Sequence, residues 1–416
     1  MKKYDLIVVG GGFSGTAAAI AAARGGASVL LVDKSNCLGG AACNCLVNPF
    51  TRFTTTIDGE KVFLIAGIFK EIRSRLEARG AMMKALFLEE DLKVVLCDMV
   101  REAGVDLLFH AYLSRVEKDG GLLKKAFFSS VGGEISLEAD YFIDATGDAQ
   151  LSFLAGVPTV LGREEDHLCQ PMTLCFRVGN ADVETFFENK DQLNAIYNKA
   201  QQNGEIQNPR ENVLAFRSLL PGVIHFNTTR IVKLDPTSAF DLTKAELQAR
   251  EQVFEIFEFM KKHAKGLENS FLMMTAPEIG VRESRMIVGD YVLTGDDCIN
   301  CAKFEDAIAA CNYSIDIHNP EGSGTYIHNF EPGEFFTVPY RSLIPKTLEN
   351  VLVVGRCISS DHVAQASYRT MGTVACIGQA AGTAMAQAIQ GKKTTREVNV
   401  KELQNELKNN SAFIGI

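Results

Sequence analysis

The sequence has no tryptophan, only 11 prolines among 416 residues, and no apolar run of the ~20 residues that a membrane-spanning helix needs. Its first residues pass from two lysines directly into a short apolar stretch, without the small-residue cleavage site of a secretory signal. The sequence therefore predicts a cytoplasmic protein with no membrane partner.

Basic residues are in deficit. Lys and Arg total 42 against 51 Asp and Glu, which gives a net charge of −9. Nucleic-acid binding depends on cationic side chains that neutralise phosphates, so we expect no nucleic-acid partner. A small-molecule substrate is expected instead. A local basic pocket for an anionic molecule and a homo-oligomeric state stay open.

The cysteines follow neither a disulfide nor a zinc pattern. Their number is odd, at 11, and their spacing is irregular, which is typical of reduced thiols in a cytosolic enzyme. Cys298, Cys301 and Cys311 come nearest to a metal site, but they lack a fourth ligand at zinc spacing. No metal site is predicted.

The first 33 residues carry the strongest motif. Residues 6–9 read as a buried strand, and the glycine-rich turn Gly10-Gly-Gly-Phe-Ser-Gly15 follows directly. An alanine-rich helix over 16–23 and a second strand over 28–32 lead to Asp33. The order of strand, glycine turn, helix, strand and acid is typical of a dinucleotide-binding fold.

Each part of this unit has a physical role. Gly10 allows the tight turn, Gly12 lets the backbone approach a pyrophosphate, and Gly15 lets the helix pack closely on the strand. The phosphates then lie at the helix N-terminus, where free N–H groups and the dipole favour negative charge. Asp33 is placed to accept hydrogen bonds from the adenosine ribose hydroxyls.

Three later segments distinguish FAD from NAD. Leu38-Gly39-Gly40 follows the acid directly, residues 141–147 read as a strand ending in Ala-Thr-Gly, and residues 350–355 read as a strand ending in glycine. With the first motif, these segments resemble the glutathione-reductase and fumarate-reductase superfamily of flavoproteins with two dinucleotide-binding folds. The resemblance implies that the first segment holds the ADP half of FAD and that the Ala-Thr-Gly turn closes the nucleotide site.

A narrower resemblance covers roughly residues 4–390. It rests on the following segments: Asp144-Ala-Thr-Gly-Asp-Ala149, Cys169-Gln-Pro-Met-Thr173, His225-Phe-Asn-Thr-Thr-Arg230, Gly280-Val-Arg-Glu-Ser-Arg285, Gly289-Asp-Tyr-Val-Leu-Thr294, Ile315-Asp-Ile-His-Asn-Pro320, Val338-Pro-Tyr-Arg-Ser-Leu-Ile-Pro345 and Gly355-Arg-Cys-Ile-Ser359. As a set they resemble the FAD-dependent oxidoreductase family of bacterial proteins. Because similar folds act on varied substrates, this resemblance implies a fold and a cofactor but no particular reaction.

The fold class expected is α/β, with a Rossmann-like FAD/NAD(P)-binding domain and an interleaved α+β substrate domain. We assign residues 1–48, 92–156 and 336–391 to the FAD domain, 49–91 to a helical cap, and 157–335 to the substrate domain. Residues 392–416 form a C-terminal tail, whose last eight residues are expected to fray. Helices are predicted over 94–104, 244–262 and 370–389, and short strands over 105–140.

The predicted FAD contacts come from the glycine turns and from the resemblance. They are Gly10, Gly12, Phe13, Ser14, Gly15, Asp33, Lys34, Gly39, Gly40, Ala145, Thr146, Gly147, Gly355, Gly372 and Thr373. The resemblance further implies that the N-terminus of the helix over 370–389 points at the flavin N1/C2=O edge. There the helix dipole would stabilise a reduced, anionic flavin.

Three residues are predicted to take part in catalysis. His362, on a loop that the preceding strand delivers to the flavin, is the candidate for proton transfer because imidazole titrates near neutral pH. Arg369 is the candidate for binding a substrate carboxylate or carbonyl, as an arginine in a similar place does in fumarate-reductase-like flavoproteins. Arg285 is the third. Structural roles for His362 and Arg369, in hydrogen bonding or ion pairing, stay open.

The predicted substrate contacts are Asn227, Arg230, Arg282 and Tyr340, and His318 and Arg341 are further polar residues of the same region. If residues 281–287 form a strand, Arg282 and Arg285 point to opposite faces, whereas on a helix they share one face. These arginines indicate a polar substrate, either anionic or polyhydroxylated.

Cys43 and Cys45 come just after the second glycine pair, where disulfide reductases carry their redox cysteines. Those enzymes use a longer spacing, and they carry a second glycine motif for NADPH that is absent here. Buried spectator thiols are the favoured interpretation. Covalent attachment to the flavin and a redox role are the alternatives.

The function predicted is an FAD-dependent oxidoreductase that transfers a hydride between flavin N5 and a small polar substrate. No NAD(P)H domain is visible, so an unidentified electron acceptor is expected. The alternatives are an FAD-binding electron-transfer subunit and an enoate (fumarate-like) reductase. A flavoprotein acting on tRNA is disfavoured by the acidic charge.

Overall fold

The computed structural model describes residues 3–416, and a seven-stranded sheet forms its centre. The strands of this sheet are β7 (Asp106–Leu108), β2 (Val29–Val32), β1 (Tyr4–Val9), β10 (Gly133–Asp144), β9 (Leu122–Ser130) and β8 (Tyr112–Asp119), in that order, with β21 (Val351–Val353) paired to β10. Strand β10 has two kinds of partner. Its first half pairs antiparallel with β9, and its second half pairs parallel with β1 and β21.

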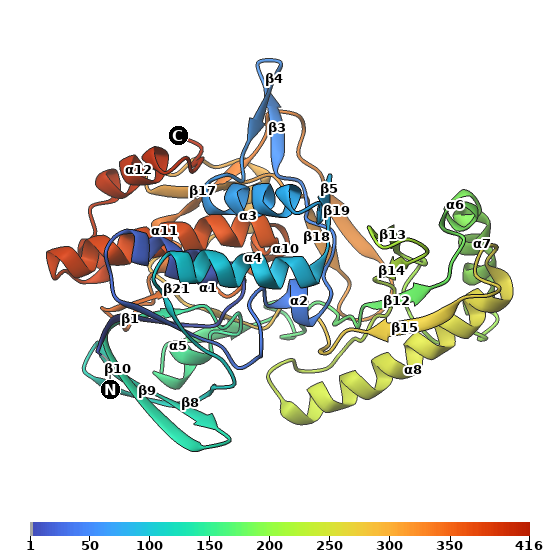
Figure 1. Ribbon diagram of the computed structural model, residues 1–416, viewed down its shortest axis with the longest axis horizontal. Helices are drawn as coiled ribbons and strands as arrows, with labels where there is room; N and C mark the ends of the chain where they lie inside the picture. Colours follow the sequence, from blue (N-terminus) through green and yellow to red (C-terminus); the bar gives the residue numbers. More distant parts are fainter. Residues whose placement is uncertain (1–2) are drawn as a thin grey trace.

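Alternating side chains place apolar residues on both faces of this sheet. Leu6 and Val8 of β1 point into a large first core, whereas Ile7 and Val9 point into a smaller core on the other face. The large core is covered by helices α1 (Phe13–Arg24), α3 (Gly67–Ala78), α4 (Glu89–Glu102) and α11 (Met371–Gly391), which lie on one side of the sheet (Figure 1). This is the expected nucleotide-binding domain.

Helices α1 and α11 come from opposite ends of the chain and are in close contact. A Cβ added to Gly378 would overlap the carbonyl oxygen of Ser14, and a Cβ added to Gly382 would overlap that of Ala18. The two glycines therefore let the helix backbones touch. This contact fixes the start of α11 relative to the glycine turn.

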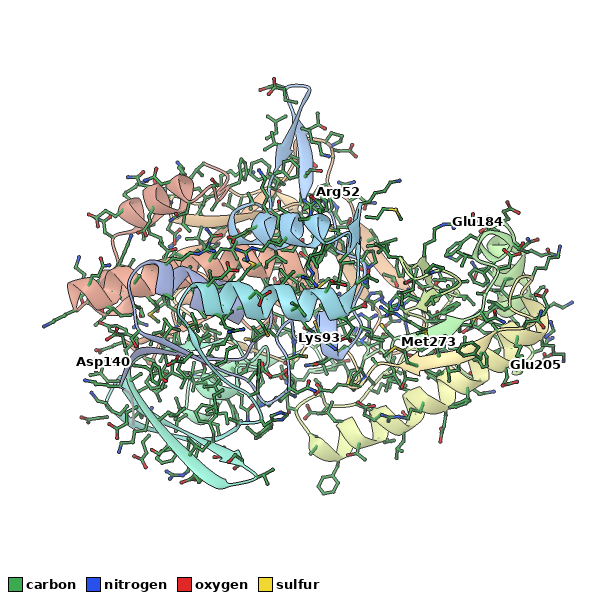
Figure 2. The ribbon with its side chains drawn as sticks, in the orientation of Figure 1. Arg52, Lys93, Asp140, Glu184, Glu205 and Met273 are labelled. Atoms are coloured by element: carbon green, nitrogen blue, oxygen red, sulfur yellow. The ribbon has the colours of Figure 1, made fainter. Side chains whose placement is uncertain are left out.

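A second core lies in a separate lobe, at the right of Figure 1. Its sheet has the order β13 (Ala215–Arg217), β14 (Ile224–Phe226), β12 (Phe176–Gly179) and β15 (Phe271–Thr275). Its helices are α6 (Val183–Glu188), α7 (Lys190–Gln202) and α8 (Ala239–His263). With side chains drawn, Lys93 of α4 marks the first lobe and Met273 of β15 marks the second (Figure 2).

The remaining elements are short. They are α2 (Ala41–Asn44), β3 (Thr54–Ile57), β4 (Glu60–Phe63), β5 (Met82–Met83), β6 (Leu86–Phe87), α5 (Gln150–Leu154), β11 (Thr159–Leu161), β16 (Arg285–Ile287), α9 (Gly295–Ile299), β17 (Ala307–Cys311), β18 (Ile315–His318), β19 (Thr325–His328), β20 (Phe336–Pro339), η1 (Tyr340–Leu343), α10 (His362–Tyr368), η2 (Thr395–Glu397) and α12 (Val400–Asn409). The β3–β4 hairpin projects from the first lobe (Figure 1). Among residues 3–416, we find no helix with the length and apolarity needed to cross a bilayer.

Packing differs from the predicted domain boundaries in three places. Apolar residues between Phe50 and Phe87, assigned to a helical cap, pack in the first core. Apolar residues between Leu293 and Phe330 pack in the first core, so residues 157–335 contribute to both lobes. The expected tail is also part of the first core, because Leu403, Leu407 and Ile414 are buried there. The amphipathic pattern of α12 explains this, since its leucines recur four residues apart and form one buried face.

Candidate functional site

The glycine turn has the close approaches that the sequence predicts. Gly10 has φ +109°, and a Cβ there would overlap the Ala145 carbonyl. A Cβ on Gly15 would overlap the Gly10 carbonyl. By contrast, a Cβ on Gly12 would meet no atom of the described chain within 4 Å, so the start of α1 faces open space. This geometry fits a pyrophosphate at the helix N-terminus.

Asp33 and the second glycine pair support this turn. The Asp33 carboxylate accepts hydrogen bonds from the Gly11 amide and from the backbone and hydroxyl of Ser35. The Gly39 amide donates to the Gly11 carbonyl at 2.9 Å, and a Cβ on Gly40 would lie 3.0 Å from the Gly12 Cα. The two glycine segments therefore form one surface. Lys34 points outward and forms an exposed 3.8 Å ion pair with Glu278.

The Ala-Thr-Gly turn lies beside the glycine turn. The Ala145 amide donates to the Val9 carbonyl at 2.8 Å, and Thr146 Oγ1 donates to Asp144 Oδ1 at 2.7 Å. Gly147, with φ +79°, lies against the guanidinium of Arg356, which pairs with Asp148 at 2.6 Å. Burial acts to raise the pKa of Asp148, but Arg356 and Ser284 outweigh it and lower that pKa.

The remaining predicted FAD residues meet at the two helix N-termini. Phe13 packs against Phe50 and Phe69, so it supports the turn from the core. Gly355 approaches Ser14, whose Oγ would lie 3.0 Å from an added Cβ. Gly372 and Thr373 lie in the first turn of α11, whose N–H groups have no partner within the helix. The Thr370 hydroxyl contacts Thr373 Oγ1 at 3.0 Å instead of capping these groups.

Residues 362–368 form helix α10, whereas the sequence predicted a loop over 360–369. Asp361 caps this helix by accepting from the Ala364 amide at 2.7 Å. The cap holds His362 in the first turn, where its side chain is buried. His362 Nδ1 lies 2.7 Å from Glu283 Oε1, and Glu283 is fully buried. Glu283 thus fixes the imidazole, and the sequence interpretation missed it.

Gln170 links this pair to two arginines. Its backbone amide donates to Glu283 Oε2 at 2.8 Å, and its Oε1 accepts from Arg369 at 3.2 Å. Its Nε2 donates to Gln365 Oε1 at 3.1 Å, and Gln365 Nε2 donates to the Arg282 carbonyl at 2.9 Å. One hydrogen-bond network therefore holds His362, Arg369 and Arg282.

Arg282 lies in extended chain just before β16. Its guanidinium donates to the Pro171 carbonyl and Thr173 Oγ1, and it approaches Asn227 Oδ1 at 3.5 Å. Burial lowers the pKa of Arg282 to about 9, with repulsion from Arg369 and Arg210 adding to the effect. The predicted contacts Arg282 and Asn227 are therefore brought together.

Asp316 and His318, on β18, face the same arginines. Asp316 Oδ2 lies 3.5 Å from His318 Nε2 and accepts from the Tyr313 hydroxyl at 3.2 Å. Burial lowers the pKa of His318 to about 3, and Arg282 adds to this while Asp316 opposes it. Burial would raise the pKa of Asp316, but His318, Arg369 and Arg282 together bring it well below its usual range.

Three predicted site residues make most of their contacts outside the cluster of Arg282, Arg369, Asp316 and His318. Arg285 points the other way from Arg282, as the strand alternative predicted: its Nε donates to the Asp148 carbonyl at 3.2 Å and its guanidinium covers Phe153. Arg230 is 1% exposed, and Tyr340 is 2% exposed with its hydroxyl bonded to the Thr395 carbonyl at 2.8 Å. Tyr340 therefore holds the C-terminal segment.

Arg230 connects the β18–β19 turn to the second lobe. It donates to the carbonyls of Gly322 and Gly324 at 3.1 and 3.0 Å and pairs with Glu211 at 3.2 Å. It also contacts His318 Nδ1 and Thr325 Oγ1, both at 3.2 Å. These partners engage the guanidinium and hold the β18–β19 turn against the second lobe.

The second-lobe sheet presents a polar face that the sequence interpretation missed. Arg177 of β12 and His225 of β14 are paired across the two strands. Their neighbours Phe176 and Phe226 point into the second core, so Arg177 and His225 lie on the opposite face, which meets the first lobe. Arg177 forms a buried ion pair with Glu89 of α4. His225 is 2% exposed, and both its ring nitrogens lack a partner among residues 3–416. Burial, then Arg177, lowers its pKa to about 3.

Cys43 and Cys45 are buried free thiols that point in different directions. Cys43 Sγ lies 4.0 Å from the Glu89 carbonyl, and Cys45 Sγ lies 3.5 Å from the Ile279 carbonyl. Burial raises the pKa of Cys45 to about 12, which opposes thiolate formation. The two thiols therefore contact different carbonyls rather than each other.

Comparison with known proteins places this geometry in context. A family model described as FAD dependent oxidoreductase matches residues 5–407. Glutathione reductase from Debaryomyces hansenii is 31% identical over 164 residues, which are 37% of this chain and 29% of that protein. The match thus spans less than a third of that relative.

Two solved structures are similar over most of the chain. A geranylgeranyl bacteriochlorophyll reductase-like protein from Thermoplasma acidophilum has 13% identity and a TM-score of 0.48, over 98% of this chain and 84% of that one. The p-nitrophenol 4-monooxygenase PnpA from Pseudomonas putida has 11% identity and a TM-score of 0.46, over 97% and 83%.

Proposed function

The chain belongs to the FAD dependent oxidoreductase family, and from this premise we propose that it transfers a hydride between flavin N5 and a small polar substrate. FAD is its cofactor, and when bound it supplies the site that accepts or donates the hydride. The substrate is an alcohol or amine that is oxidised, or an activated double bond that is reduced in the reverse sense. An external acceptor, either oxygen or a protein, completes the cycle.

The glycine turn at the start of α1 and the first turn of α11, here called the cradle, support FAD through their shape and their free N–H donors. Gly10, Gly12 and Gly15 would hold the pyrophosphate, and Asp33 would hold the adenosine ribose. The first-turn amides at Gly372 and Thr373 would face the flavin N1/C2=O edge, where they favour negative charge.

The His362–Glu283 pair carries the proposal. A carboxylate on Nδ1 fixes the tautomer and orientation of an imidazole, so Nε2 is the atom that takes or gives a proton. Glu283 is itself held by the Gln170 amide, which resists rotation of the pair. His362 would therefore remove the hydroxyl or ammonium proton as the adjacent carbon loses its hydride.

Positive charge next to this pair would orient the substrate. Arg369 is the C-cap of α10 and comes seven residues, about two turns, after His362. Gln170 accepts a hydrogen bond from Arg369 and donates one to Glu283, the partner of His362. A guanidinium near the reacting atom favours polar and negatively charged groups. This supports a polar substrate over an apolar one.

Anaerobic reduction of the flavin tests the proposal. The purified holoprotein is mixed with alcohols, amino acids, polyols and hydroxy acids, and loss of the visible flavin band is followed in time. Enoates are added to the dithionite-reduced protein for the reverse direction. We expect one class to react, and His362→Gln and Glu283→Gln to slow the reaction by about 10²-fold or more.

His167→Asn, at an exposed histidine, is the matched control and should react like the parent protein. A substrate that reacts equally fast with His362→Gln overturns the proton-transfer assignment. A flavin that no small molecule reduces or oxidises, but that exchanges electrons with a partner flavoprotein, would instead establish an electron-transfer subunit.

A further inference from the structure

We propose that the face of the second-lobe sheet that meets the first lobe binds two neighbouring, uncharged hydroxyl groups through His225, Arg177 and Asn48. The inference rests on the proposed function and names the substrate class, a polyol or a sugar. Its starting point is a set of four buried polar atoms that lack a partner among residues 3–416. They are Asn48 Oδ1, Arg177 Nε and both ring nitrogens of His225.

Hydrogen bonds and strand register bring these three side chains together. Asn48 donates from Nδ2 to Glu89 Oε1 at 2.9 Å, and the guanidinium of Arg177 donates to the same oxygen. Arg177 and His225 are direct partners in the β12–β14 pair, and side chains of such partners are neighbours on one face of a sheet. The unpartnered atoms therefore belong to one cluster.

The hydrogen-bonding capacity of this cluster can be assigned atom by atom. Asn48 Nδ2 donates to the Phe87 carbonyl at 2.8 Å and to the Glu89 carboxylate, so Asn48 Oδ1 is the acceptor that is left. Arg177 Nε is a donor, and a neutral imidazole has one donor and one acceptor. The cluster thus offers two donors and two acceptors.

The cluster has no net charge. Glu89 and Arg177 compensate each other in a buried ion pair. His225 is neutral, because burial and the Arg177 cation lower its pKa to about 3. An ionised group would lose its hydration here without a free counter-ion, which is costly. A hydroxyl group is uncharged and both donates and accepts, so two hydroxyls match the two donors and two acceptors.

The same face leads to the proposed catalytic residues. Asn227 comes two residues after His225, so the alternation of the strand places both side chains on one face, about 7 Å apart along the chain. Arg282 approaches Asn227 Oδ1 at 3.5 Å, and its backbone carbonyl accepts from Gln365. Gln365 belongs to the network that holds His362. The cluster therefore lies on the substrate side of that network.

Two aromatic rings border the cluster. Phe216 of β13 is the other strand partner of His225, and their ring centroids are 6.2 Å apart. Phe271 of β15 is 55% exposed, and its ring lies against Gly179, which shares a face with Arg177. Polyols and sugars alternate hydroxyl groups with C–H groups, and apolar C–H surface packs well on aromatic rings. These rings favour a polyol or a sugar.

Binding to the oxidised holoprotein tests the inference without turnover. Xylitol, myo-inositol, glucose and methyl glucoside are titrated against the flavin absorbance and against thermal unfolding. Cyclohexanol and 1-pentanol serve as compounds of similar carbon skeleton with a single hydroxyl. We expect at least one of the polyhydroxylated compounds to bind about tenfold or more tightly than either mono-alcohol, because a missing hydroxyl leaves buried groups unpaired.

The variants separate a binding role from a structural one. His225→Phe should weaken that compound by about tenfold or more, yet the ligand-free protein should unfold at the same temperature or a higher one, because a buried imidazole without partners is replaced by an apolar ring. His225→Gln keeps one donor and one acceptor and should retain part of the affinity. Bound FAD and circular dichroism show whether each variant is folded.

His263→Phe is the matched control. His263 ends α8 and stacks on Phe259, with ring centroids 4.6 Å apart, and Phe259 packs in the second core, on the other side of the sheet from His225. This variant should bind like the parent protein.

Three results would overturn the inference: no binding of any polyhydroxylated compound, equal affinity for the mono-alcohols, or unchanged affinity in folded His225→Phe. Because no hydride moves in this assay, polyol binding can succeed where flavin reduction fails, and then only the proposed reaction is wrong. Conversely, flavin reduction by a compound without neighbouring hydroxyls, at a rate that His225→Phe leaves unchanged, would overturn this inference alone.

Discussion

Gly378 of α11 lies directly on the carbonyl of Ser14 in α1, with no room for a side chain between the two helix backbones. Ser14 belongs to the glycine turn, and Gly378 follows the first turn of α11 by less than two turns. The phosphate end and the proposed flavin end of the FAD site are therefore joined through a direct backbone contact.

Gly378→Ala should lower stability and weaken FAD binding together. The added methyl group overlaps the Ser14 carbonyl, and such overpacking costs about 1–3 kcal/mol or more where backbone must move. Thermal unfolding and FAD titration of the apoprotein measure both effects. Gly132→Ala is the control, because a Cβ there would lie 3.8 Å from its nearest neighbour, Ser130 Oγ. Equal behaviour of the two variants would contradict the proposed contact.

Arg230→Met should lower stability. The change removes the guanidinium that holds the Gly322 and Gly324 carbonyls and leaves Glu211 without its partner, so the free energy of unfolding should fall by roughly 3 kcal/mol. Urea unfolding measures the loss. Arg163→Met, at an arginine that pairs with Asp166 near the surface, is the control and should cost less than about 1 kcal/mol. Equal losses in the two variants would contradict the structural role of Arg230.

Glu89→Gln should be among the more destabilising single changes. It removes the charge that compensates Arg177 in a buried ion pair between the two lobes, and breaking such a pair costs about 3–5 kcal/mol. Urea denaturation at neutral pH measures the loss. Glu90→Gln, at an exposed neighbour in an ion pair with Lys93, is the control and should cost less than about 1 kcal/mol. A small loss for both variants would show that the pair contributes little.

Acid should destabilise the protein partly through His225. Its pKa is about 3 in the folded state, below the ordinary value of 6.5, so the unfolded chain binds a proton first as pH falls. The stabilisation is complete above pH 6.5 and is lost progressively between that value and about 3. The groups facing His225 are Arg177, which opposes its protonation, and the Arg177 partner Glu89.

Urea unfolding between pH 7 and 4 should therefore show a shallower pH slope for His225→Gln, by up to about 1.4 kcal/mol per pH unit. The exposed-histidine variant His167→Asn should keep the slope of the parent. His318, with a pKa also lowered to about 3, contributes in the same direction and remains present in both variants. If His225→Gln keeps the slope of the parent protein, the pKa of His225 is not lowered on folding.

Local sequence patterns were sufficient to predict the nucleotide-binding half. The spacing of Gly10, Gly12 and Gly15 is set by backbone contacts within one strand-turn-helix unit, so the motif and the geometry coincide. The helix over 370–389 was also placed to within two residues of α11. Helix α4 begins at Glu89, five residues before the prediction, because its first acidic turn gave no apolar periodicity.

The substrate side could be predicted only in part, because its residues meet through tertiary contacts. Glu283 and Gln170 lay within recognisable segments, yet nothing in one sequence indicated that they would meet His362. Arg230 and Tyr340 are buried with backbone carbonyls as partners, and polarity alone does not distinguish such a residue from one that lines a pocket.

The contact between α1 and α11 has a consequence for biosynthesis. The apolar side of α1 is complete once Arg24 is synthesised, but the helix that covers it ends only at Gly391. Strand β10 likewise waits for β21 as its parallel neighbour. A nascent chain therefore keeps part of this core exposed until Gly391 has been added, so chaperone binding to the first helix and late acquisition of the yellow colour are expected on the ribosome.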